Sequence, residues 1–329
     1  MSLRCVSCSN QILGNLLIMS SATEKPKIII ICGPTGIGKT AVAVDLAHHF
    51  NGQIIGADSM QIYKYMDIGT AKPTAEEQNR VVHHMIDIVE PDETFDAARY
   101  AGLARAKIFA LSQQSMTPFV VGGTGLYIKA LLYGLFNAAV SDPDVRRRLK
   151  EEGAVHGSEY LHARLGRLDP ETARRLHAHD TYRILRALEV VETTGKPISR
   201  HHREHGFLEQ PFRSLKIGLN MDRAILYEGI NARVDAMISA GFVDEVRNLL
   251  ARGYPVDLKS LQSIGYRHMI DYIEGRLSWE ECTRTLKRDH RRYAKRQLTW
   301  FGADPEIIWK EPVQASQIMG LINNFLGRT

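Results

Sequence analysis

The sequence is poor in cysteine and has no long apolar run. Its 329 residues include only four cysteines, at positions 5, 8, 32 and 282. Thiols this few and this scattered do not build a disulfide framework, which suits a reducing compartment. Cys5 and Cys8 supply only half of the ligands that a structural zinc ion needs, so we expect no zinc site there. The apolar stretch at 12–19 is far shorter than the ~20 residues of a membrane span. These absences exclude secreted disulfide scaffolds and predict a cytoplasmic protein with no membrane segment.

Neither sign of charge dominates the chain. Lys and Arg total 42 against 37 Asp and Glu, which gives a formal net charge of +5. This mild excess permits an anionic partner without demanding one, so the positions of the charges matter more than their sum. Hydrophobic residues make up 44% of the chain, as in ordinary globular proteins, and the length allows one large domain plus a smaller one. Residues 1–26 precede the first strand-like run, and we expect them to form a disordered extension.

Short apolar runs alternate with helical stretches along most of the chain. Residues 27–32, KIIIIC, have the continuous apolar pattern of a strand that is buried on both faces of a parallel sheet. Similar runs, with helical stretches such as 41–50 and 97–113 between them, lie at 53–57, 85–89, 119–121, 216–219 and 307–309. This alternation predicts an α/β fold, a mostly parallel sheet flanked by helices. In such sheets, ligands bind beyond the carboxyl ends of the strands.

The pattern changes between about residues 141 and 211, where no strand-like run appears. Asp142-Pro143 is a helix-start signal because an acidic capping residue precedes a proline in the first turn, and Asp169-Pro170 repeats it. We therefore predict an all-helical insertion domain that interrupts the sheet-containing core. The expected boundaries are 1–26 for the extension, 27–137 and 212–329 for the core, and 138–211 for the insertion.

Residues 33–40, GPTGIGKT, fit the phosphate-binding pattern G-x-x-x-x-G-K-[ST] and lie between a strand and a helix, the context that confirms this pattern. The glycines let backbone N–H groups turn toward an anion, and the helix N-terminus adds partial positive charge. Lys39 is expected to reach terminal phosphate oxygens, and the Thr40 hydroxyl suits Mg²⁺. The motif predicts a P-loop NTPase-like fold. Kinases, ATPases and transferases all use this loop, so other residues must decide the chemistry.

Two further features follow strands that should neighbour the loop. Asp58 comes just after the run 53–57, where a carboxylate can hold Mg²⁺, act as a general base, or cap a helix. Residues 122–125, Gly-Gly-Thr-Gly, follow the run 119–121. Their backbone amides can form a second anion-binding nest with the Thr124 hydroxyl, or the glycines can serve a tight strand–helix turn. We expect both features at the same edge of the sheet as the phosphate loop.

Several longer motifs closely resemble the bacterial tRNA dimethylallyltransferases, also called tRNA isopentenyltransferases. The resemblance extends from about residue 27 to 309, and the segment 66–73, MDIGTAKP, makes it specific because its sequence is chemically arbitrary. The departures are the N-terminal extension and Ile37, which stands where Ser is common. The matching motifs lie at 33–40, 58–63, 66–73, 122–127, 142–146, 182–189, 265–267 and 294–300.

The resemblance implies transfer of the dimethylallyl group of dimethylallyl diphosphate to N6 of adenosine 37 in the anticodon loop of tRNA, with diphosphate released. It implies that Asp58 is the base that takes the N6 proton, and that Thr124 and Lys39 support the reacting centre. Mg²⁺ is the implied cofactor, with Thr40 as its ligand. The implied diphosphate-binding residues are Gly33, Pro34, Thr35, Gly36, Ile37, Gly38, Lys39, Thr40 and Arg233. Arg233 has the equally simple alternative of a solvated helix residue.

The resemblance also implies a set of tRNA contacts, since an adenine must leave the loop stack before it reacts. They are Asp58, Ser59, Met60, Gln61, Thr124, Arg146, Tyr182, Arg183, Ile184, Leu185, Arg186, Gln262, Ser263, Ile264, Gly265, Tyr266, Arg267, Lys295, Arg296, Gln297, Leu298, Thr299, Trp300, Phe301 and Gly302. We expect the enzyme to act as a monomer.

An independent sign of RNA binding is a basic run at helical spacing. Seven cations recur at three- and four-residue steps and occupy about 140° of one helix face. They are Arg284, Lys287, Arg288, Arg291, Arg292, Lys295 and Arg296, interrupted by Asp289, while Leu286, Tyr293, Ala294 and Leu298 lie on the other face. A continuous cationic stripe suits a phosphate backbone, although a solvated helix face gives the same pattern.

Two other functions compete with tRNA modification. A related transferase could prenylate free AMP, ADP or ATP, which would leave the helical insertion and the basic helix without a purpose. A P-loop nucleotide kinase would place ATP on the loop and Mg²⁺ on Asp58, and would leave residues 66–73 unexplained.

Overall fold

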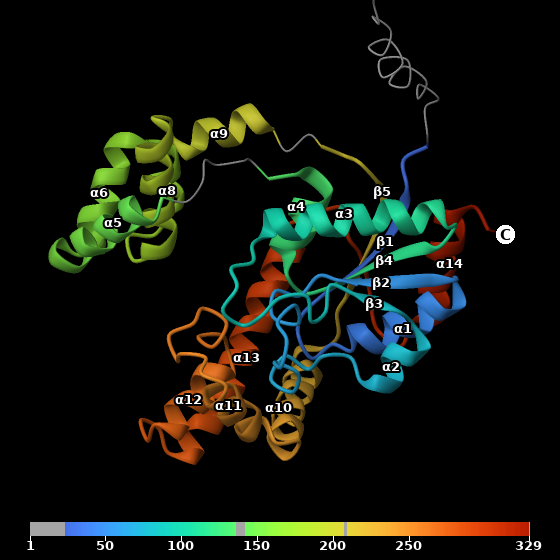
Figure 1. Ribbon diagram of the computed structural model, residues 1–329. Coiled ribbons are helices and arrows are strands. Elements are labelled where there is room, and N and C mark those ends of the chain that lie inside the picture. The colour runs from blue at the N-terminus through green and yellow to red at the C-terminus, as the bar shows by residue number, and fades with distance from the viewer. Residues whose placement is uncertain (1–23, 136–141, 207–208, 329) are drawn as a thin grey trace, which may run out of the picture.

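The computed structural model describes residues 24–135, 142–206 and 209–328. Its centre is a six-stranded parallel sheet with the strand order β3-β2-β4-β1-β5-β6, flanked by helices (Figure 1). This confirms the predicted α/β, P-loop-like parallel sheet. Residues 1–23, including Cys5 and Cys8, and the proposed boundary near 137 lie outside the described residues.

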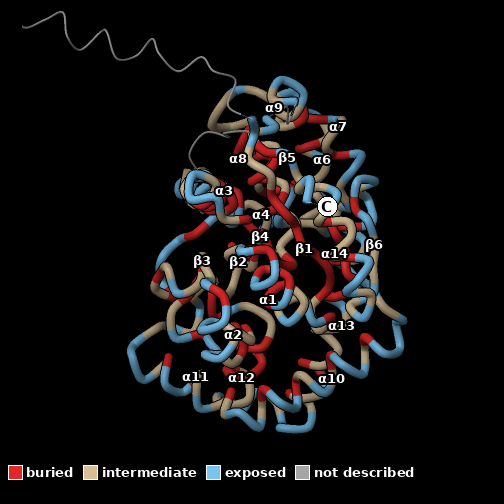
Figure 2. The backbone as a smooth tube through the Cα atoms, turned by 90° about the vertical axis from the view of Figure 1, so that its right-hand side faces the viewer, coloured by how far each residue is buried: buried red, intermediate tan, exposed pale blue. Residues whose placement is uncertain are grey.

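The central strand is β1 (Lys27–Cys32), which pairs with β4 (Thr117–Gly122) on one side and β5 (Arg213–Leu219) on the other. Beyond these lie β2 (Gly52–Gly56) and the short β6 (Ile308–Lys310). Strands β1 and β4 and most of β2 and β5 are buried, as the red segments of Figure 2 show, whereas the edge strands β3 and β6 have no buried residue. All the strands except β3 match the apolar runs in the sequence.

One predicted strand, 85–89, is wrong. The edge strand β3 is His83–His84, and Met85 and Asp87 have φ angles of 66° and 53°, outside the extended region. The chain turns here because Asp87 forms an ion pair with the nearly buried Lys72, and Val89 reaches a bridge to Tyr63. The apolar run 85–89 therefore turns after β3 and does not continue the strand.

Both faces of β1 are buried, and its alternating side chains enter two different cores. Ile28 and Ile30 pack with α3 (Ala97–Gln113) and α4 (Gly125–Tyr133). Ile29 and Ile31 pack with α1 (Lys39–His49) and α14 (Ala315–Leu326) on the opposite face. Because successive side chains of β1 point to opposite faces, the sheet lies between two layers of helices.

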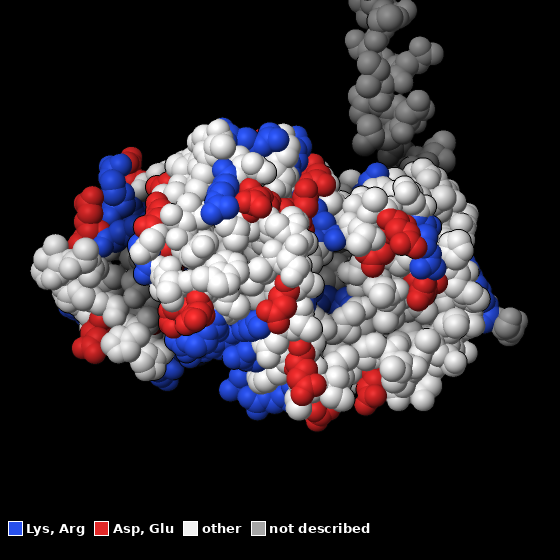
Figure 3. Space-filling view, turned by 90° about the horizontal axis from the view of Figure 1, so that it is seen from below, with Lys and Arg blue, Asp and Glu red and all other residues white. Residues whose placement is uncertain are grey.

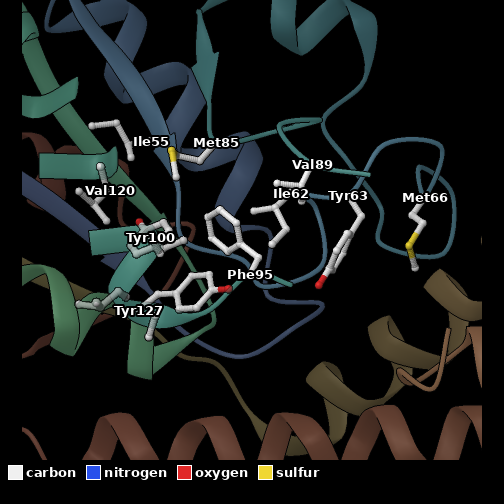
Figure 4. Packing of buried hydrophobic residues seen from close by; sticks show 14 of the residues in the cluster. Ile55, Ile62, Tyr63, Met66, Met85, Val89, Phe95, Tyr100, Val120 and Tyr127 are labelled. Carbon is white, nitrogen blue, oxygen red and sulfur yellow. The ribbon is translucent and has the colours of Figure 1, made fainter. Parts of the chain in front are cut away.

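Aromatic rings fill the α3–α4 side of the sheet beside the loops that carry the candidate site. Tyr100 and Tyr127 stack with ring centroids 4.3 Å apart, and Phe95 lies 6.3 Å from Tyr127 (Figure 4). Tyr63 and Met66 extend the same cluster toward the segment 66–73. The segment is thereby anchored to the sheet core.

Below the sheet in Figure 1 lies a helical layer, α10 to α13. Its helices are α10 (Arg223–Ser239), α11 (Phe242–Ala251), α12 (Tyr266–Ile273) and the long α13 (Trp279–Gly302). The short helix α2 (Ala75–Arg80) lies at the edge of the sheet. Helix α13 runs from this layer up to α4, so it connects the lower layer with the sheet.

Residues 143–205 form five helices that lie apart from the sheet (Figure 1): α5 (Pro143–His156), α6 (Ser158–Leu168), α7 (Pro170–Arg175), α8 (Thr181–Thr194) and α9 (Ile198–His205). They share a core of their own around Leu149, Leu161 and Leu188. Asp142 and Asp169 cap α5 and α7 as the sequence predicted. The Asp169 carboxylate also accepts a hydrogen bond from the Ser199 amide, which ties α9 to α7.

No helix among the described residues has the length and apolar character that crossing a membrane requires.

Candidate functional site

The predicted phosphate loop and the residues after β2 line one cavity of about 480 Å³ at the carboxyl edge of the sheet. Helices α10 and α13 supply its other wall through Arg233, His290, Tyr293 and Gln297. The strand ends and the lower helical layer therefore enclose a single space, as expected of a ligand site in a parallel α/β sheet.

The phosphate loop has the backbone that its glycines allow. Gly33, Gly36 and Gly38 have φ angles of 148°, 81° and 87°. A Cβ on Gly33 would lie 2.7 Å from the Leu219 carbonyl oxygen, so close packing on β5 also requires this glycine. Lys39 follows at the N-terminus of α1, where its ammonium group donates to the Pro34 carbonyl at 2.8 Å. The loop thus forms a cradle with a cation folded across it.

Lys39 carries its charge in an unfavourable setting. Burial and the neighbouring Arg233 guanidinium lower the pKa of Lys39 to about 8, and the Asp58 carboxylate partly opposes this shift. Burial also lowers the pKa of Arg233, again opposed by Asp58. Two crowded cations beside an open cradle make a site that an anion would stabilise.

Asp58 lies in a tight turn directly after β2. Its Oδ1 accepts hydrogen bonds from the amides of Met60 at 2.8 Å and Gln61 at 3.4 Å, so the carboxylate shapes its own loop. The next amide, that of Ser59, donates to the Thr124 hydroxyl at 3.0 Å. Burial and Asp58 raise the pKa of Tyr293 to about 12, and the Thr124 side chain partly opposes this shift. Asp58 and Thr124 are thus held side by side at two strand ends, as predicted.

The second glycine-rich turn owes its glycines to close packing. A Cβ on Gly122 would lie 2.1 Å from the Ala57 carbonyl oxygen, and one on Gly125 would lie 2.1 Å from Trp300 Nε1. The Thr124 amide already donates to the Ala57 carbonyl at 3.0 Å. Because this amide already has a partner within the protein, it is not available to an anion. The tight-turn alternative is therefore favoured over a second anion nest.

Gln297 connects the two glycine turns. Its Oε1 accepts a hydrogen bond from the Thr35 amide at 2.8 Å, and its Nε2 donates to the Gly123 carbonyl at 2.9 Å. The side chain is almost fully buried. Helix α13 is thereby attached directly to the phosphate loop through one residue, which was predicted only as an RNA contact.

The segment 66–73 forms another wall, and a single carboxylate fixes it. Glu245 on α11 accepts hydrogen bonds from the amides of Asp67, Ile68 and Gly69 at 2.8, 2.6 and 3.0 Å. The Tyr266 hydroxyl donates to the same carboxylate at 2.6 Å. The unusual sequence of this segment therefore has a structural basis, which local sequence patterns did not reveal.

A second, larger cavity of about 1040 Å³ lies on the α4 side of α13. Its floor is apolar, with Ile128, Leu132 and Phe301, and its rim is cationic. The cations of the rim come from α4, from α8 of the helical insertion and from α13, namely Lys129, Arg183, Arg292, Lys295 and Arg296. Lys216 of β5 also lines the cavity, but it is buried and pairs with Asp304. Arg296 lines both cavities, so the groove between core and insertion meets the phosphate cavity at α13.

The basic run does lie on one helix, α13, but much of its charge is paired within the protein. Arg284 pairs with Glu281, Lys287 with Asp235, and Arg288 with Asp289. The Arg291 guanidinium donates to Asn231 Oδ1 at 2.6 Å. Seen from below, Lys and Arg side chains gather in a patch with acidic side chains at its border (Figure 3). The exposed Lys295 and Arg296, toward the C-terminal end of the run, are the better candidates for contacting a polyanion.

The predicted RNA contacts of the helical insertion differ in how far their side chains are buried. Tyr182 is 65% exposed, and the Arg146 guanidinium stacks over its ring at 5.5 Å. The buried Glu189 carboxylate holds Arg186 at 3.0 Å and Arg146 at 3.8 Å. These side chains form a cationic and aromatic surface on α5 and α8, close to Arg183 at the groove.

Five predicted RNA contacts have side chains that the folded protein buries: Ile184, Leu185, Tyr266, Gln297 and Phe301. Ile184 and Leu185 lie on the inner face of the amphipathic α8, where they pack in the core of the insertion. Tyr266, Gln297 and Phe301 nevertheless line the two cavities, so the motifs that carry the predicted RNA contacts combine core positions with cavity positions.

The remaining predicted residues lie on the cavity walls, at the surface or against the core. Ser59, Met60, Gln61, Ser263 and Ile264 line the smaller cavity, and Thr299 and Trp300 line the larger one. Gln262 and Gly302 are exposed, Arg267 pairs with Asp289, and Leu298 packs against the sheet core.

His290 is a cavity residue that the sequence analysis missed. It lies on α13 four residues after Leu286 and three before Tyr293, on the inner face of the helix. A histidine within an otherwise apolar helix face is a signal that could have identified it.

Comparisons with known proteins cover nearly the whole chain. The family model described as IPP transferase matches residues 61–304. A tRNA dimethylallyltransferase of Desulfosudis oleivorans is 54% identical over 303 residues, which are 92% of this chain and 96% of that protein. One of Syntrophobacter fumaroxidans is 51% identical over 92% of this chain and 87% of that protein.

Solved structures give the same result for the fold. The crystal structure of the full-length tRNA isopentenylpyrophosphate transferase from Bacillus halodurans aligns with a TM-score of 0.69 and 40% identity, over 92% of this chain and 97% of that chain. A eukaryotic dimethylallyltransferase acting on tRNA aligns with a TM-score of 0.78 and 26% identity, over 92% and 80% of the two chains. The similarity therefore includes both the sheet and the helical insertion.

Proposed function

Because this chain belongs to the IPP transferase family, we propose that it transfers the dimethylallyl group of dimethylallyl diphosphate to N6 of adenosine 37 in the anticodon loop of tRNA. The chain is a prenyltransferase of the tRNA dimethylallyltransferase type. The observation that carries the finer proposal is the shared cavity, which Asp58 lines together with the phosphate loop and Arg233, while Thr124 accepts the amide of the adjacent Ser59. Diphosphate is the proposed leaving group.

The leaving group requires cations because negative charge grows on it as the carbon–oxygen bond breaks. The cradle of residues 33–40, with Lys39 and Arg233, would hold that charge in a partly desolvated space, where electrostatic stabilisation is strong. Burial and the nearby Arg233, which lower the pKa of Lys39, support this role, because an incoming anion would offset both effects.

The adenine N6 is a weak nucleophile since its lone pair is delocalised into the ring. A base that accepts the N6 proton during attack therefore lowers the barrier, and Asp58 is the proposed base. Its Oδ1 is engaged by the amides of its own turn. Thr124 is proposed to position this turn through the Ser59 amide, next to the reacting carbon.

Mg²⁺ is the proposed cofactor, and the donor set fits it. Mg²⁺ commonly binds phosphate oxygens, water and only one or two protein oxygens, and the Thr40 hydroxyl lines the cavity at the start of α1. When bound, the ion would neutralise charge on the diphosphate.

Removing the proposed magnesium ligand should raise the metal requirement. We expect Thr40→Val to increase the half-saturating Mg²⁺ concentration about tenfold, equivalent to ~1.4 kcal/mol. Thr40→Ser retains the hydroxyl and serves as the matched control. Turnover at graded Mg²⁺ concentrations measures the effect, and identical Mg²⁺ curves for the valine and serine variants would remove Thr40 from the proposal.

The anticodon loop is proposed to dock in the groove between α13 and the helical insertion. The exposed Lys295 and Arg296 lie on one side of it, and Arg183 lies on the other. An extruded adenine would then enter the smaller cavity beside Arg296, which lines both spaces.

The pairing of charges along α13 predicts unequal contributions to RNA binding. We expect Lys295→Ala to weaken tRNA binding and lower the slope of log affinity against log salt by about 0.7–0.9, the loss of one phosphate contact. Arg284→Ala should change the slope little, because Glu281 already pairs with Arg284. Filter binding at graded salt concentrations measures both. Equal slopes for Lys295→Ala and wild type would argue against this docking face.

The proposal is tested as a whole by nucleoside analysis of tRNA before and after incubation with enzyme, Mg²⁺ and labelled dimethylallyl diphosphate. N6-isopentenyladenosine should appear in tRNA. Label in AMP instead would favour an adenylate transferase, and phosphoryl transfer from ATP without prenyl transfer would favour a kinase. The cationic groove supports tRNA as the acceptor, because the binding of a free nucleotide does not require it.

A further inference from the structure

Buried polar atoms without a partner are concentrated in residues that line the smaller cavity. Six buried side-chain nitrogen or oxygen atoms of the described chain have no hydrogen-bond partner, and three of them belong to residues that line this cavity. The three are Arg233 Nε, Ser263 Oγ and His290 Nε2. Leaving such groups unpaired is costly, so a cluster of them in one cavity indicates a polar ligand that satisfies them.

His290 is the titratable member of this cluster to which no role has been given. It lies on α13, on the wall that faces the phosphate loop across the cavity. Burial, Arg233 on α10 and His268 on α12 lower the pKa of His290 to about 4, so its ring is neutral in the empty site. A neutral imidazole with a free ring nitrogen can either donate or accept a hydrogen bond.

The charges around His290 favour an anion as the ligand. Asp289 is the nearest acid on its own helix, but Arg267, Arg288 and His268 already engage that carboxylate. The charged residues that line the cavity are the cations Lys39, Arg233 and Arg296 and the acids Asp58 and Glu77. An anion that enters next to Arg233 would therefore reverse the sign of the field at the ring.

We propose that His290 is a further residue of the diphosphate site, where its ring takes a proton from solvent as the anion enters and donates a charged hydrogen bond to a phosphate oxygen. The inference rests on the proposed function, since it assigns diphosphate to this cavity. Proton uptake places a third cation opposite the loop only while the anion is present. Three permanent positive charges would repel one another whenever the anion is not bound, and a histidine that gains its proton with the anion avoids this cost.

Proton uptake on binding sets the direction in which diphosphate affinity changes with pH. The complex holds more protons than the free protein, so His290 strengthens diphosphate binding as pH falls toward neutrality and loses that contribution at alkaline pH. Titration of diphosphate itself and of Lys39 adds to the total, but it is common to wild type and to His290 variants. The difference between proteins isolates His290.

The experiment is calorimetric titration of the full-length protein with inorganic diphosphate at fixed Mg²⁺, in two buffers of different ionisation enthalpy. We expect His290→Leu to weaken binding about 10- to 100-fold, the loss of a charge-assisted hydrogen bond. His290→Gln retains a polar group of similar reach but cannot be protonated. It should bind better than the leucine variant and take up fewer protons than wild type.

A matched control is available elsewhere in the sheet. His83 on β3 also has a buried Nε2 without a partner and a lowered pKa, but it does not line this cavity. His83→Gln should leave diphosphate affinity and proton uptake unchanged. Thermal melting of each variant confirms that it is folded before its binding is interpreted.

The outcomes separate the two proposals. Wild-type affinity and proton uptake in both His290 variants, with prenyl transfer intact, would overturn the role of His290 and leave the proposed function standing. Loss of tRNA affinity in His290→Leu, with diphosphate affinity unchanged, would assign the ring to the RNA and equally overturn the inference. A wild-type protein that binds no diphosphate and transfers no prenyl group would defeat the proposed function itself.

Discussion

Replacing Asp58 by asparagine is expected to reduce prenyl transfer by ~10²–10⁴-fold, the usual contribution of a general base. The asparagine side chain keeps an oxygen that can accept the Met60 and Gln61 amides, so the turn after β2 should persist. What it loses is the capacity to take a proton from the adenine amine. Affinity for tRNA should therefore change little, and single-turnover kinetics with saturating tRNA and donor measures the chemical step.

Asp58→Ala tests the same residue in a second way, because it removes both the proposed base and the hydrogen-bond acceptor of the turn. We expect it to be at least as inactive as Asp58→Asn and also less stable. Glu77→Gln is the matched control. Glu77 lines the same cavity, but its carboxylate caps α2 by accepting the Thr74 amide at 2.8 Å, and glutamine can do the same. Near-normal turnover by Asp58→Asn, or an equal loss in Glu77→Gln, would refute Asp58 as the base.

Local sequence was sufficient for the parts of the site that depend on short-range geometry. The phosphate loop was predicted because its glycines, lysine and threonine must stand at fixed spacing between a strand and a helix. Asp58 followed from its place at a strand end, and the caps Asp142 and Asp169 from their own helix starts. In each case the interacting groups are only a few residues apart.

Features that depend on distant partners were not predictable in this way. The run 85–89 has the composition of a strand, but Lys72 draws Asp87 into a turn. Gly123 is required by Gln297, 174 residues further along the chain. The basic run on α13 was identified correctly, while the pairing of Lys287 with Asp235 depends on how α10 packs against that helix. Such contacts arise only when the helical layer folds against the sheet.

Helix α13 lines both cavities. Its outer face carries Lys295 and Arg296 toward the groove, and its inner face carries His290 and Gln297 toward the phosphate cavity. Gln297 also bonds the Thr35 amide of the loop. A polyanion bound on the outer face would thus contact the same helix that lines the proposed diphosphate site.

Replacing Lys39 by methionine is expected to lower kcat/KM for the prenyl donor by ~10²–10³-fold, the usual effect of removing one group that stabilises developing negative charge. Methionine fills similar space without the charge, and Lys39→Arg serves as the charged comparison. Diphosphate affinity should fall in parallel, whereas tRNA affinity should not, because Lys39 lies in the smaller cavity and not on the groove.

The stability of the Lys39 variant should move in the opposite direction from its activity. Burial and Arg233 disfavour the charged ammonium group in the ligand-free protein, as its lowered pKa indicates. Removing the charge therefore relieves a cost of folding, and the Tm of Lys39→Met should equal or exceed that of wild type. An inactive variant with an undiminished Tm would locate the loss in the reaction itself. A variant that retains donor kinetics within about threefold would contradict the role of Lys39, because that change is equivalent to less than ~1 kcal/mol of transition-state stabilisation.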